Sequence, residues 1–371
     1  MAGETPPPAP VRCTKSPTSP KSPKSPKSKS SSPKAGSPEA SEVAGILPAQ
    51  HWIDTAEEYG TDGSDAGSVI SSTASLTASI LEYRKIHGRT YHSEIGNASY
   101  WASNDDQQNE SMDINHHVQT LVIGGKFFLA PLDTDKIHKV LDIGTGTGSW
   151  ALDFADEYPN IEVIGTDVSP IQSTWVPPNL KFEIEDCTLP WTFDHNSIDY
   201  VHIRWLIGSI ADWEAVYKEA FNALVPGGWL ETQEGSGAFT SDDGTVGEKA
   251  ALNQWGKIFA NFGKTIGRPF TVVADGIQRK AMEAAGFVDI QEIDYKTPVG
   301  TWPKDPQLKE IGQYTQYALE ADMEGYVIYP ATAIGWTPEE VTVYAAHVRR
   351  EIRNPDIHAY YRQKVVYGRK P

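Results

Sequence analysis

The chain has 371 residues, 39% of them hydrophobic, which is enough apolar material for one large domain or two smaller ones. Residues 1–40 contain seven Lys or Arg and two Asp or Glu, which gives a net charge of +5. The remaining residues contain 25 Lys or Arg and 47 Asp or Glu, which gives a net charge of −22. Because so acidic a body repels a phosphate backbone, we expect no direct nucleic-acid binding by the folded domain. No segment approaches the roughly 18 apolar residues of a membrane span, so no span is expected.

Residues 1–67 read as a disordered tail rich in Ser, Pro and Lys. Lys21-Ser22-Pro23 and Lys24-Ser25-Pro26 repeat a unit that suits proline-directed kinases, and the lysines around them fit either a nuclear import signal or a solvated linker. Only two cysteines are present, one of them in this tail, which excludes a disulfide framework and a cysteine zinc site. We therefore expect the protein in the nucleus, the cytoplasm or both.

The pattern of residues 68–371 predicts one domain in which short apolar strands alternate with helical lengths. Residues 116–132 read as a helix that continues into an apolar segment before the first strand of the sheet. Parallel strands joined by helical crossovers form a doubly wound α/β sheet, which is the fold class we expect. Strands are predicted at 139–143, 161–167, 180–185, 198–203, 229–234, 287–295 and 361–368, and helices at 147–158, 213–224, 249–263 and 272–285.

A helical insertion is predicted at about residues 298–356, between the last two strands. Helical periodicity is present at 306–321 and 338–353. Trp302, Trp336 and many tyrosines in this insertion suggest a lid packed over a pocket, although core packing is the usual role of such aromatic side chains.

A glycine-rich turn follows the first predicted strand of the sheet. Asp142 lies at the strand end, and Gly144, Gly146 and Gly148 then allow a tight turn in which a ligand can approach the backbone before a helix N-terminus. Asp167 ends the next strand nineteen residues after Gly148, where a carboxylate can accept hydrogen bonds from both hydroxyls of a ribose. An NAD-dependent oxidoreductase uses the same arrangement, so these residues alone leave the cofactor open.

Two further features favour an adenosyl ligand with a sulfonium rather than a dinucleotide. Asp186 follows the third strand, where its side chain can accept from the adenine amino group, and the backbone N–H of Cys187 can donate to a ring nitrogen. The turn Pro226-Gly227-Gly228 separates a helix from a strand, as methyltransferases commonly have before their fifth strand. Together with the glycine-rich turn, these features predict S-adenosylmethionine as the cofactor.

His202, Arg204 and Trp205 follow the fourth strand and are candidates for the substrate side of the site. His202 is the best candidate for a base, but a strand-end histidine held by a hydrogen bond is the more ordinary role, so we assign no catalytic residue. The adjacent His116 and His117 point to different faces of a helix, and no metal site is predicted.

Several stretches of the chain resemble the fungal LaeA-like methyltransferases, which are regulators of secondary metabolism and development. The resemblance implies a class I methyltransferase fold, a doubly wound and mostly parallel sheet with an antiparallel last strand. It also implies that Asp142 through Gly148 hold the methionine part of S-adenosylmethionine, Asp167 the ribose, and Asp186 with Cys187 the adenine. The matching stretches are Gly88-Arg89-Thr90-Tyr91-His92, Val140 to Trp150, Val163 to Gln172, Trp175 to Asn179, Val201 to Arg204, Pro226 to Glu231 and Val366 to Pro371.

The resemblance implies a regulatory methyltransferase that acts in a protein complex, and association with velvet-type regulatory proteins in the nucleus is known for family members. Two alternatives stay open. The chain could methylate a small fungal metabolite in an apolar pocket shaped by the insertion, or it could be a non-catalytic scaffold that binds S-adenosylmethionine.

Overall fold

The computed structural model describes residues 45–56, 83–93 and 100–371, all of which belong to the unit Ala40–Pro371. Most of the predicted tail therefore lies outside the described residues. The helices are α1 (Ala49–Ala56), α2 (Asp106–Val122), α3 (Ser149–Glu157), α4 (Trp213–Ala223), α5 (Ala251–Ile266), α6 (Ile277–Ala285), α7 (Pro306–Ala321), α8 (Met323–Ala333) and α9 (Pro338–Arg353). The strands are β1 (Arg84–Ile86), β2 (Arg89–Tyr91), β3 (Lys139–Ile143), β4 (Glu162–Asp167), β5 (Leu180–Ile184), β6 (Ile198–Arg204), β7 (Leu224–Thr240), β8 (Val288–Pro298) and β9 (Tyr360–Arg369).

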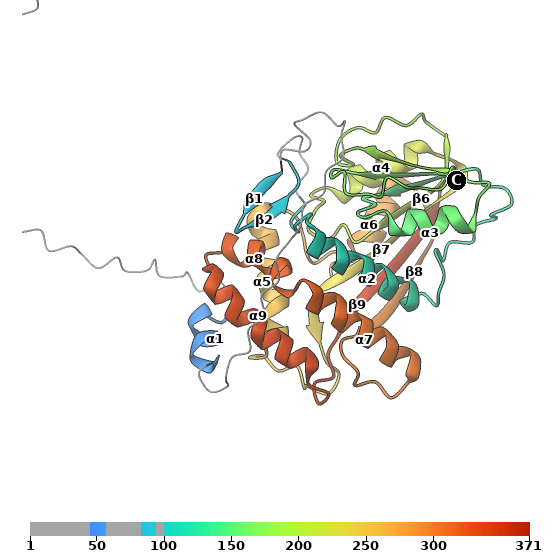
Figure 1. Ribbon diagram of the computed structural model, residues 1–371. Helices are drawn as coiled ribbons and strands as arrows, with labels where there is room; N and C mark the ends of the chain where they lie inside the picture. Colours follow the sequence, from blue (N-terminus) through green and yellow to red (C-terminus); the bar gives the residue numbers. More distant parts are fainter. Residues whose placement is uncertain (1–44, 57–82, 94–99) are drawn as a thin grey trace, which may run out of the picture. The chain divides into compact units, whose positions relative to one another are not determined.

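A seven-stranded sheet with the order β5-β4-β3-β6-β7-β9-β8 carries the fold (Figure 1). The pairs β4–β5, β3–β4, β3–β6 and β6–β7 are parallel, and β9 runs antiparallel to both β7 and β8. This confirms the predicted doubly wound, mostly parallel sheet with an antiparallel last strand.

Both faces of the central strand β3 are buried, as expected for a parallel strand covered by helices. Val140 packs with Phe154 of α3 on one face, whereas Leu141 and Ile143 join the larger core cluster on the other. The continuous apolar run of β3 therefore reflects its two buried faces rather than a helix.

The segment before β3 differs in its helix bounds from the prediction for residues 116–132, which was a helix that continues into an apolar segment. Helix α2 begins ten residues earlier, at Asp106, and ends at Val122. Gly124 and Gly125 both have φ of +76°, a left-handed conformation that ends the helix. The apolar residues that follow do not continue the helix. They form an irregular segment that packs in the same core cluster as β3.

Part of the range assigned to the tail is also folded. Trp52 of α1 is buried, and its ring lies 5.1 Å from that of Tyr344 in α9. The Trp52 carbonyl group accepts a hydrogen bond of 2.9 Å from His347 Nε2. The folded part of the chain thus includes a segment that precedes residue 68.

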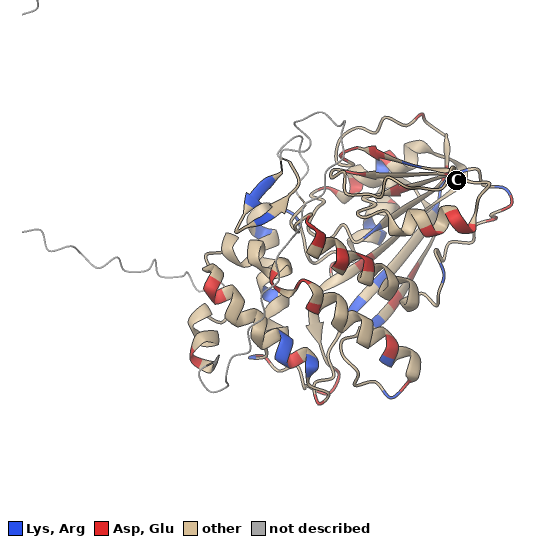
Figure 2. Ribbon diagram, in the orientation of Figure 1, with Lys and Arg blue, Asp and Glu red and all other residues tan. Residues whose placement is uncertain are grey.

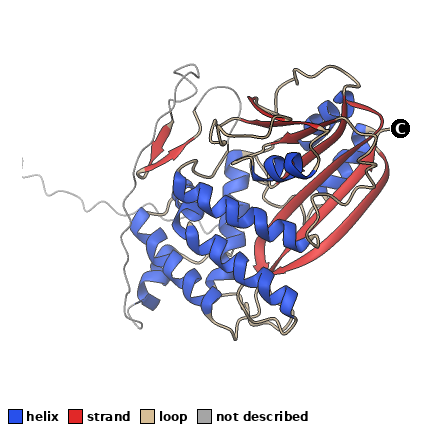
Figure 3. Cartoon of the chain, turned by 45° about the vertical axis from the view of Figure 1, so that its right-hand side comes forward, coloured by secondary structure: helices blue, strands red, loops and turns tan. Residues whose placement is uncertain are grey.

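The helical insertion predicted at about residues 298–356 consists of α7, α8 and α9, and Figure 3 shows these helices beside the strands. Helix α7 packs along α2, and α8 packs against α5 and α9. Helix α8 was not predicted, because Pro330 lies within it and its residues lack amphipathic periodicity. No helix among the described residues is both long enough and apolar enough to cross a membrane.

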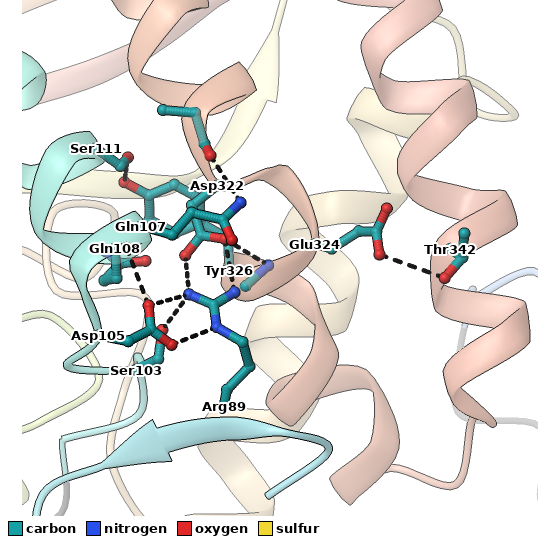
Figure 4. A network of polar contacts seen from close by, with 12 residues as sticks. Arg89, Ser103, Asp105, Gln107, Gln108, Ser111, Asp322, Glu324, Tyr326 and Thr342 are labelled. Atoms are coloured by element: carbon teal, nitrogen blue, oxygen red, sulfur yellow. Dashed lines mark hydrogen bonds and ion pairs between the residues drawn. The ribbon is translucent and has the colours of Figure 1, made fainter. Parts of the chain in front are cut away.

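Arg89, in the hairpin β1–β2, joins the N-termini of two helices (Figure 4). Its guanidinium group donates to both oxygens of Asp105, at 2.5 and 2.6 Å, and to both oxygens of Asp322, at 2.7 Å each. Asp105 caps α2 and Asp322 caps α8. These hydrogen bonds raise the pKa of Arg89, although burial alone would lower it. Arg89 thereby fixes α8 of the insertion against α2.

We expect Arg89→Ala to lower the free energy of unfolding by about 3 kcal/mol, because it leaves two carboxylates without their cation. Most of this loss comes from Asp322, because its side chain is fully buried and would be left as an unpaired charge. Denaturant unfolding of the full chain measures this change. Arg279→Ala is the control, since its exposed pair with Glu283 should contribute less than about 1 kcal/mol. Equal losses in the two variants would contradict a structural role for Arg89.

Candidate functional site

The glycine-rich turn lies at the carboxyl end of β3, where parallel strands place ligand sites. Gly144 and Gly146 have φ of +68° and +61°, and a Cβ atom on either would collide with Leu206 or Met112, respectively. The Gly146 N–H donates to Asp167 Oδ2 at 2.9 Å, which joins the turn to the end of β4. Glycine is therefore required at both positions by the backbone conformation and by the close approach of neighbouring side chains.

Asp142 and His202 lie side by side on β3 and β6. His202 Nδ1 is 2.7 Å from Asp142 Oδ1, and the His202 ring stacks on Trp150 with centroids 3.8 Å apart. Burial lowers the pKa of His202, although Asp142 acts in the opposite direction. His202 does not line the cavity described next, and its contacts are those of a strand-end histidine held by a hydrogen bond.

A cavity of about 1220 Å³, open to solvent, lies over the ends of β3, β4, β5 and β6. It brings together most of the predicted site residues, whereas Gly148 and His202 lie outside its wall. Gly148 precedes α3, and a Cβ atom there would meet Phe182. The predicted residues that line the cavity are Asp142, Gly144, Gly146, Asp167, Asp186, Cys187, Arg204 and Trp205.

Several buried polar atoms around this cavity lack a hydrogen-bond partner. Asp186 Oδ1 accepts from the backbone N–H and the hydroxyl of Thr188, at 2.9 and 2.7 Å, but no donor in the described part of the chain reaches Asp186 Oδ2. Such unpaired buried atoms are rare in proteins and indicate a missing polar partner. A ligand amino group supplies what Asp186 lacks, so the site fits an adenine. The other unpaired atoms in the wall are Asn104 Oδ1, Gln108 Oε1, Glu185 Oε2 and Ser209 Oγ.

Asp167 also suits the ribose. Its two oxygens accept from the N–H groups of Gly146 and Ser169, at 2.9 Å each, and each oxygen can accept a second hydrogen bond. Burial raises the pKa of Asp167 to about 6, although the backbone N–H groups oppose this shift. Cys187 lines the same part of the cavity, and burial raises the pKa of its thiol, which therefore stays protonated at neutral pH.

Arg204 is the only cationic side chain among the described residues that line the cavity. Its Nη2 donates to His116 Nδ1 at 2.9 Å, so the other nitrogen of His116 carries the proton that reaches Asp153 at 2.8 Å. Burial lowers the pKa of Arg204 to about 10, so it stays charged at neutral pH. His116 thus orients a cation and has no free nitrogen with which to act as a base.

Helix α2 forms a wall of the cavity that the sequence interpretation missed. Its lining side chains recur at helical spacing, but they are mostly polar, so hydrophobic periodicity did not reveal them. Asp113 on the same helix accepts from the hydroxyls of Thr147 and Ser149, at 2.6 and 2.7 Å, and so ties the glycine-rich turn to α2. The lining residues of α2 are Gln108, Met112, Asn115, His116 and Gln119.

Acidic side chains lie along α2 and α3 (Figure 2), and four more, Asp142, Asp167, Glu185 and Asp186, line the cavity. Their negative potential favours a ligand with a net positive charge. S-adenosylmethionine has such a charge at neutral pH, because its sulfonium and ammonium groups outnumber its carboxylate.

The segment after β6 is held by a buried glutamate. Trp205 has φ of +63°, an uncommon conformation for a residue other than glycine. The next two backbone N–H groups, of Leu206 and Ile207, donate to the two oxygens of Glu234 at 2.9 Å each. Glu234 thereby compensates the strained backbone and directs Trp205 toward the cavity, where its ring lines the wall.

Comparison with known proteins agrees with this site. A methyltransferase domain model matches residues 114–292. Methyltransferase pytC of Aspergillus terreus is 38% identical over 305 residues, which cover 81% of this chain and 92% of that protein. Secondary metabolism regulator LAE1 of Cochliobolus heterostrophus is 34% identical over 292 residues, which cover 77% of this chain and 94% of that protein. Protein-methionine methyltransferase laeA of Emericella nidulans is 29% identical, over 78% of this chain and 77% of that protein.

The matching domain model and these relatives confirm the methyltransferase interpretation over the dinucleotide one. The chain therefore belongs to the LaeA-like family of fungal methyltransferases and is an S-adenosylmethionine-dependent enzyme.

Proposed function

We propose that the chain methylates a small molecule of fungal secondary metabolism. The observation that carries this proposal is a second, apolar cavity that shares part of its wall with the cofactor cavity. When bound, S-adenosylmethionine would supply an electrophilic methyl group: the acceptor would bond to the methyl carbon, the electron pair of the carbon–sulfur bond would stay on sulfur, and the proton of an acceptor hydroxyl would pass to solvent. The protein contributes chiefly by holding the two molecules in line.

In this proposal the residues of the cofactor cavity divide the binding among them. Asp186 Oδ2 accepts from the adenine amino group, and Asp167 accepts from the ribose hydroxyls. Arg204, oriented by His116, pairs with the carboxylate of the cofactor. No residue is assigned as a catalytic base, since His202 lies outside the cavity wall and both ring nitrogens of His116 are already hydrogen-bonded.

A second candidate function is a regulatory role in a protein complex. The names of two relatives favour it: LAE1 is a secondary metabolism regulator, and laeA of Emericella nidulans is a protein-methionine methyltransferase. In that case the acceptor is a protein, velvet-type proteins are the proposed partners, and the basic residues of the first forty serve for entry into the nucleus, where the chain takes part in transcription regulation.

Methyl-labelled S-adenosylmethionine, incubated with the chain and a fungal extract, distinguishes these two functions. We expect label in the solvent-extractable small-molecule fraction and at least tenfold less with Asp186→Ala, roughly the effect of losing one hydrogen bond to a charged group. Label confined to protein would support the regulatory candidate instead.

Asp186→Ala should weaken S-adenosylmethionine binding by roughly 10- to 100-fold, because the adenine amino group loses a charged acceptor. Isothermal titration calorimetry of the full chain measures this. Asp194→Ala removes an exposed carboxyl side chain a few residues further on and should leave the affinity unchanged. Equal affinities for all three proteins would show that the adenine lies elsewhere.

The affinity for S-adenosylmethionine should fall as the pH decreases below about 6, by at most about tenfold per pH unit. The ribose hydroxyls donate to the ionised form of Asp167, whose pKa of about 6 means that acid converts it to the neutral form in the free protein. Calorimetry between pH 5 and 8 measures the profile. In Asp167→Asn the affinity should be lower at every pH, and the fall in affinity below about pH 6 should disappear. If that fall is unchanged in Asp167→Asn, another group causes it.

A further inference from the structure

The second cavity, of about 650 Å³, adjoins the cofactor cavity beside the end of β6. Four residues line both cavities, namely Trp101, Asn115, Trp205 and Tyr326. The remaining wall comes from β7, α5, α7 and neighbouring loops. Its residues are Ile207, Gly235, Ser236, Gly237, Phe239, Trp255, Phe259, Phe270, Thr315, Ala318, Leu319 and Tyr361.

All of these residues are buried or half-buried, so the wall of the second cavity is made of side chains from the interior of the protein. A bound polypeptide needs room for its backbone and for hydrogen bonds to it, which a wall of mostly apolar side chains does not supply. The burial and the apolar character of this wall therefore favour a small molecule.

Among the residues that the structure describes, none in the wall of the second cavity carries a formal charge. Tyr326 and Tyr361 have acidic hydroxyls, but burial raises the pKa of Tyr326 to about 12 and that of Tyr361 further. Both hydroxyls already have partners, in Ser111 and Gln363. A charged ligand group would lose its hydration there without gaining a counter-ion, which costs several kcal/mol. The occupant is therefore uncharged.

Aromatic rings dominate the wall and meet at steep angles. Trp101 lies edge-on to Phe259 and Phe270, with centroids 5.3 and 5.4 Å apart, and Trp205 lies edge-on to Tyr361 at 5.9 Å. Ring faces that are not stacked on one another remain available to a flat ligand, and aromatic pairs contribute about 0.5–1.5 kcal/mol beyond the burial of their area. This arrangement favours a molecule that contains a ring.

Asn115 of α2 is a polar side chain in the wall of the second cavity that can both donate and accept a hydrogen bond. Its side-chain amide bonds to no residue in the described part of the chain, whereas the hydroxyls of Ser236 and Thr315 are bonded to backbone groups. Since Asn115 also lines the cofactor cavity, it stands at the junction of the two. An amide both donates and accepts, so it can hold a hydroxyl or a carbonyl group.

We propose that the second cavity is the acceptor site and that it takes an uncharged, ring-containing and largely apolar small molecule, held by Asn115 through a hydroxyl or carbonyl group beside the cofactor. This inference rests on the proposed function. Asn115 acts as a positioning residue, and the apolar wall selects the acceptor.

Binding of 1-naphthol to the full chain, measured by isothermal titration calorimetry, tests the class of ligand. 1-Naphthol is flat, neutral at pH 7 and carries one hydroxyl. We expect saturable binding, and at least tenfold weaker binding of 1-naphthoate, whose carboxylate finds no cation in the pocket. Equal affinity for the two probes would overturn the inference.

Two substitutions on α7 locate the probe. Leu319→Lys brings a cation into the pocket and should weaken 1-naphthol binding at least tenfold while S-adenosylmethionine still binds, which shows that the variant is folded. Leu308→Lys on the same helix changes an exposed residue outside the pocket and should have no effect. An unchanged 1-naphthol affinity in Leu319→Lys would place the probe elsewhere.

Asn115→Leu tests the polar anchor by replacing the amide with an apolar side chain of the same branched shape. It should abolish most of the preference of the wild-type chain for 1-naphthol over naphthalene and leave naphthalene binding in place, an effect that a mere loss of fold cannot produce. A preference that survives the substitution would remove Asn115 from the proposal. Binding of S-adenosylmethionine without any binding of 1-naphthol would refute the acceptor site but not the cofactor site, whereas failure to bind S-adenosylmethionine would refute the proposed function itself.

Discussion

The parallel pairing of β3 with β4 and β6 is the constraint on which the site depends. It places the carboxyl ends of the three strands at one edge of the sheet, so that Asp142, Asp167 and Arg204 face one cavity although they are far apart in the sequence. The glycine-rich turn must then pass beneath the ligand with backbone alone. Leu206 and Met112 already occupy the space that larger residues at Gly144 and Gly146 would need, so the same glycines also allow the surrounding segments to close in.

Three glutamates with buried or half-buried side chains fix the backbone of other segments of the chain. Glu231, Glu234 and Glu351 each accept two backbone N–H groups from segments distant in sequence, and burial raises the pKa of Glu231 to about 7 and that of Glu234 to about 8. Leaving such N–H groups unpaired would cost about 1–3 kcal/mol each, so these side chains decide where the loops lie. The N–H groups belong to Leu129 and Ala130, Leu206 and Ile207, and Ala251 and Leu252, respectively.

Sequence alone predicted the parts of the molecule whose signals are local. The sequence shows apolar runs typical of strands, with the glycine-rich turn and the carboxylates at fixed spacing after them. These local patterns predicted the sheet and one side of the cofactor cavity. Arg89 lies in a stretch that matches the family, but its partner Asp322 is 233 residues away, and no local pattern reveals such a pair. The polar face of α2 and the buried Glu234 were missed for the same physical reason: their roles arise only from tertiary packing.

The arrangement separates cofactor recognition from acceptor recognition along the chain. Polar groups between β3 and β6 contact the cofactor cavity, whereas α5 and α7 supply much of the apolar pocket. Tyr326 joins the two, since it lies one helical turn after Asp322 and its hydroxyl pairs with Ser111 of α2. Because Arg89 fixes Asp322, the hairpin before the sheet determines where this shared wall stands. Changes within the insertion can therefore alter the pocket for the acceptor while the strand ends that bind the cofactor remain in place.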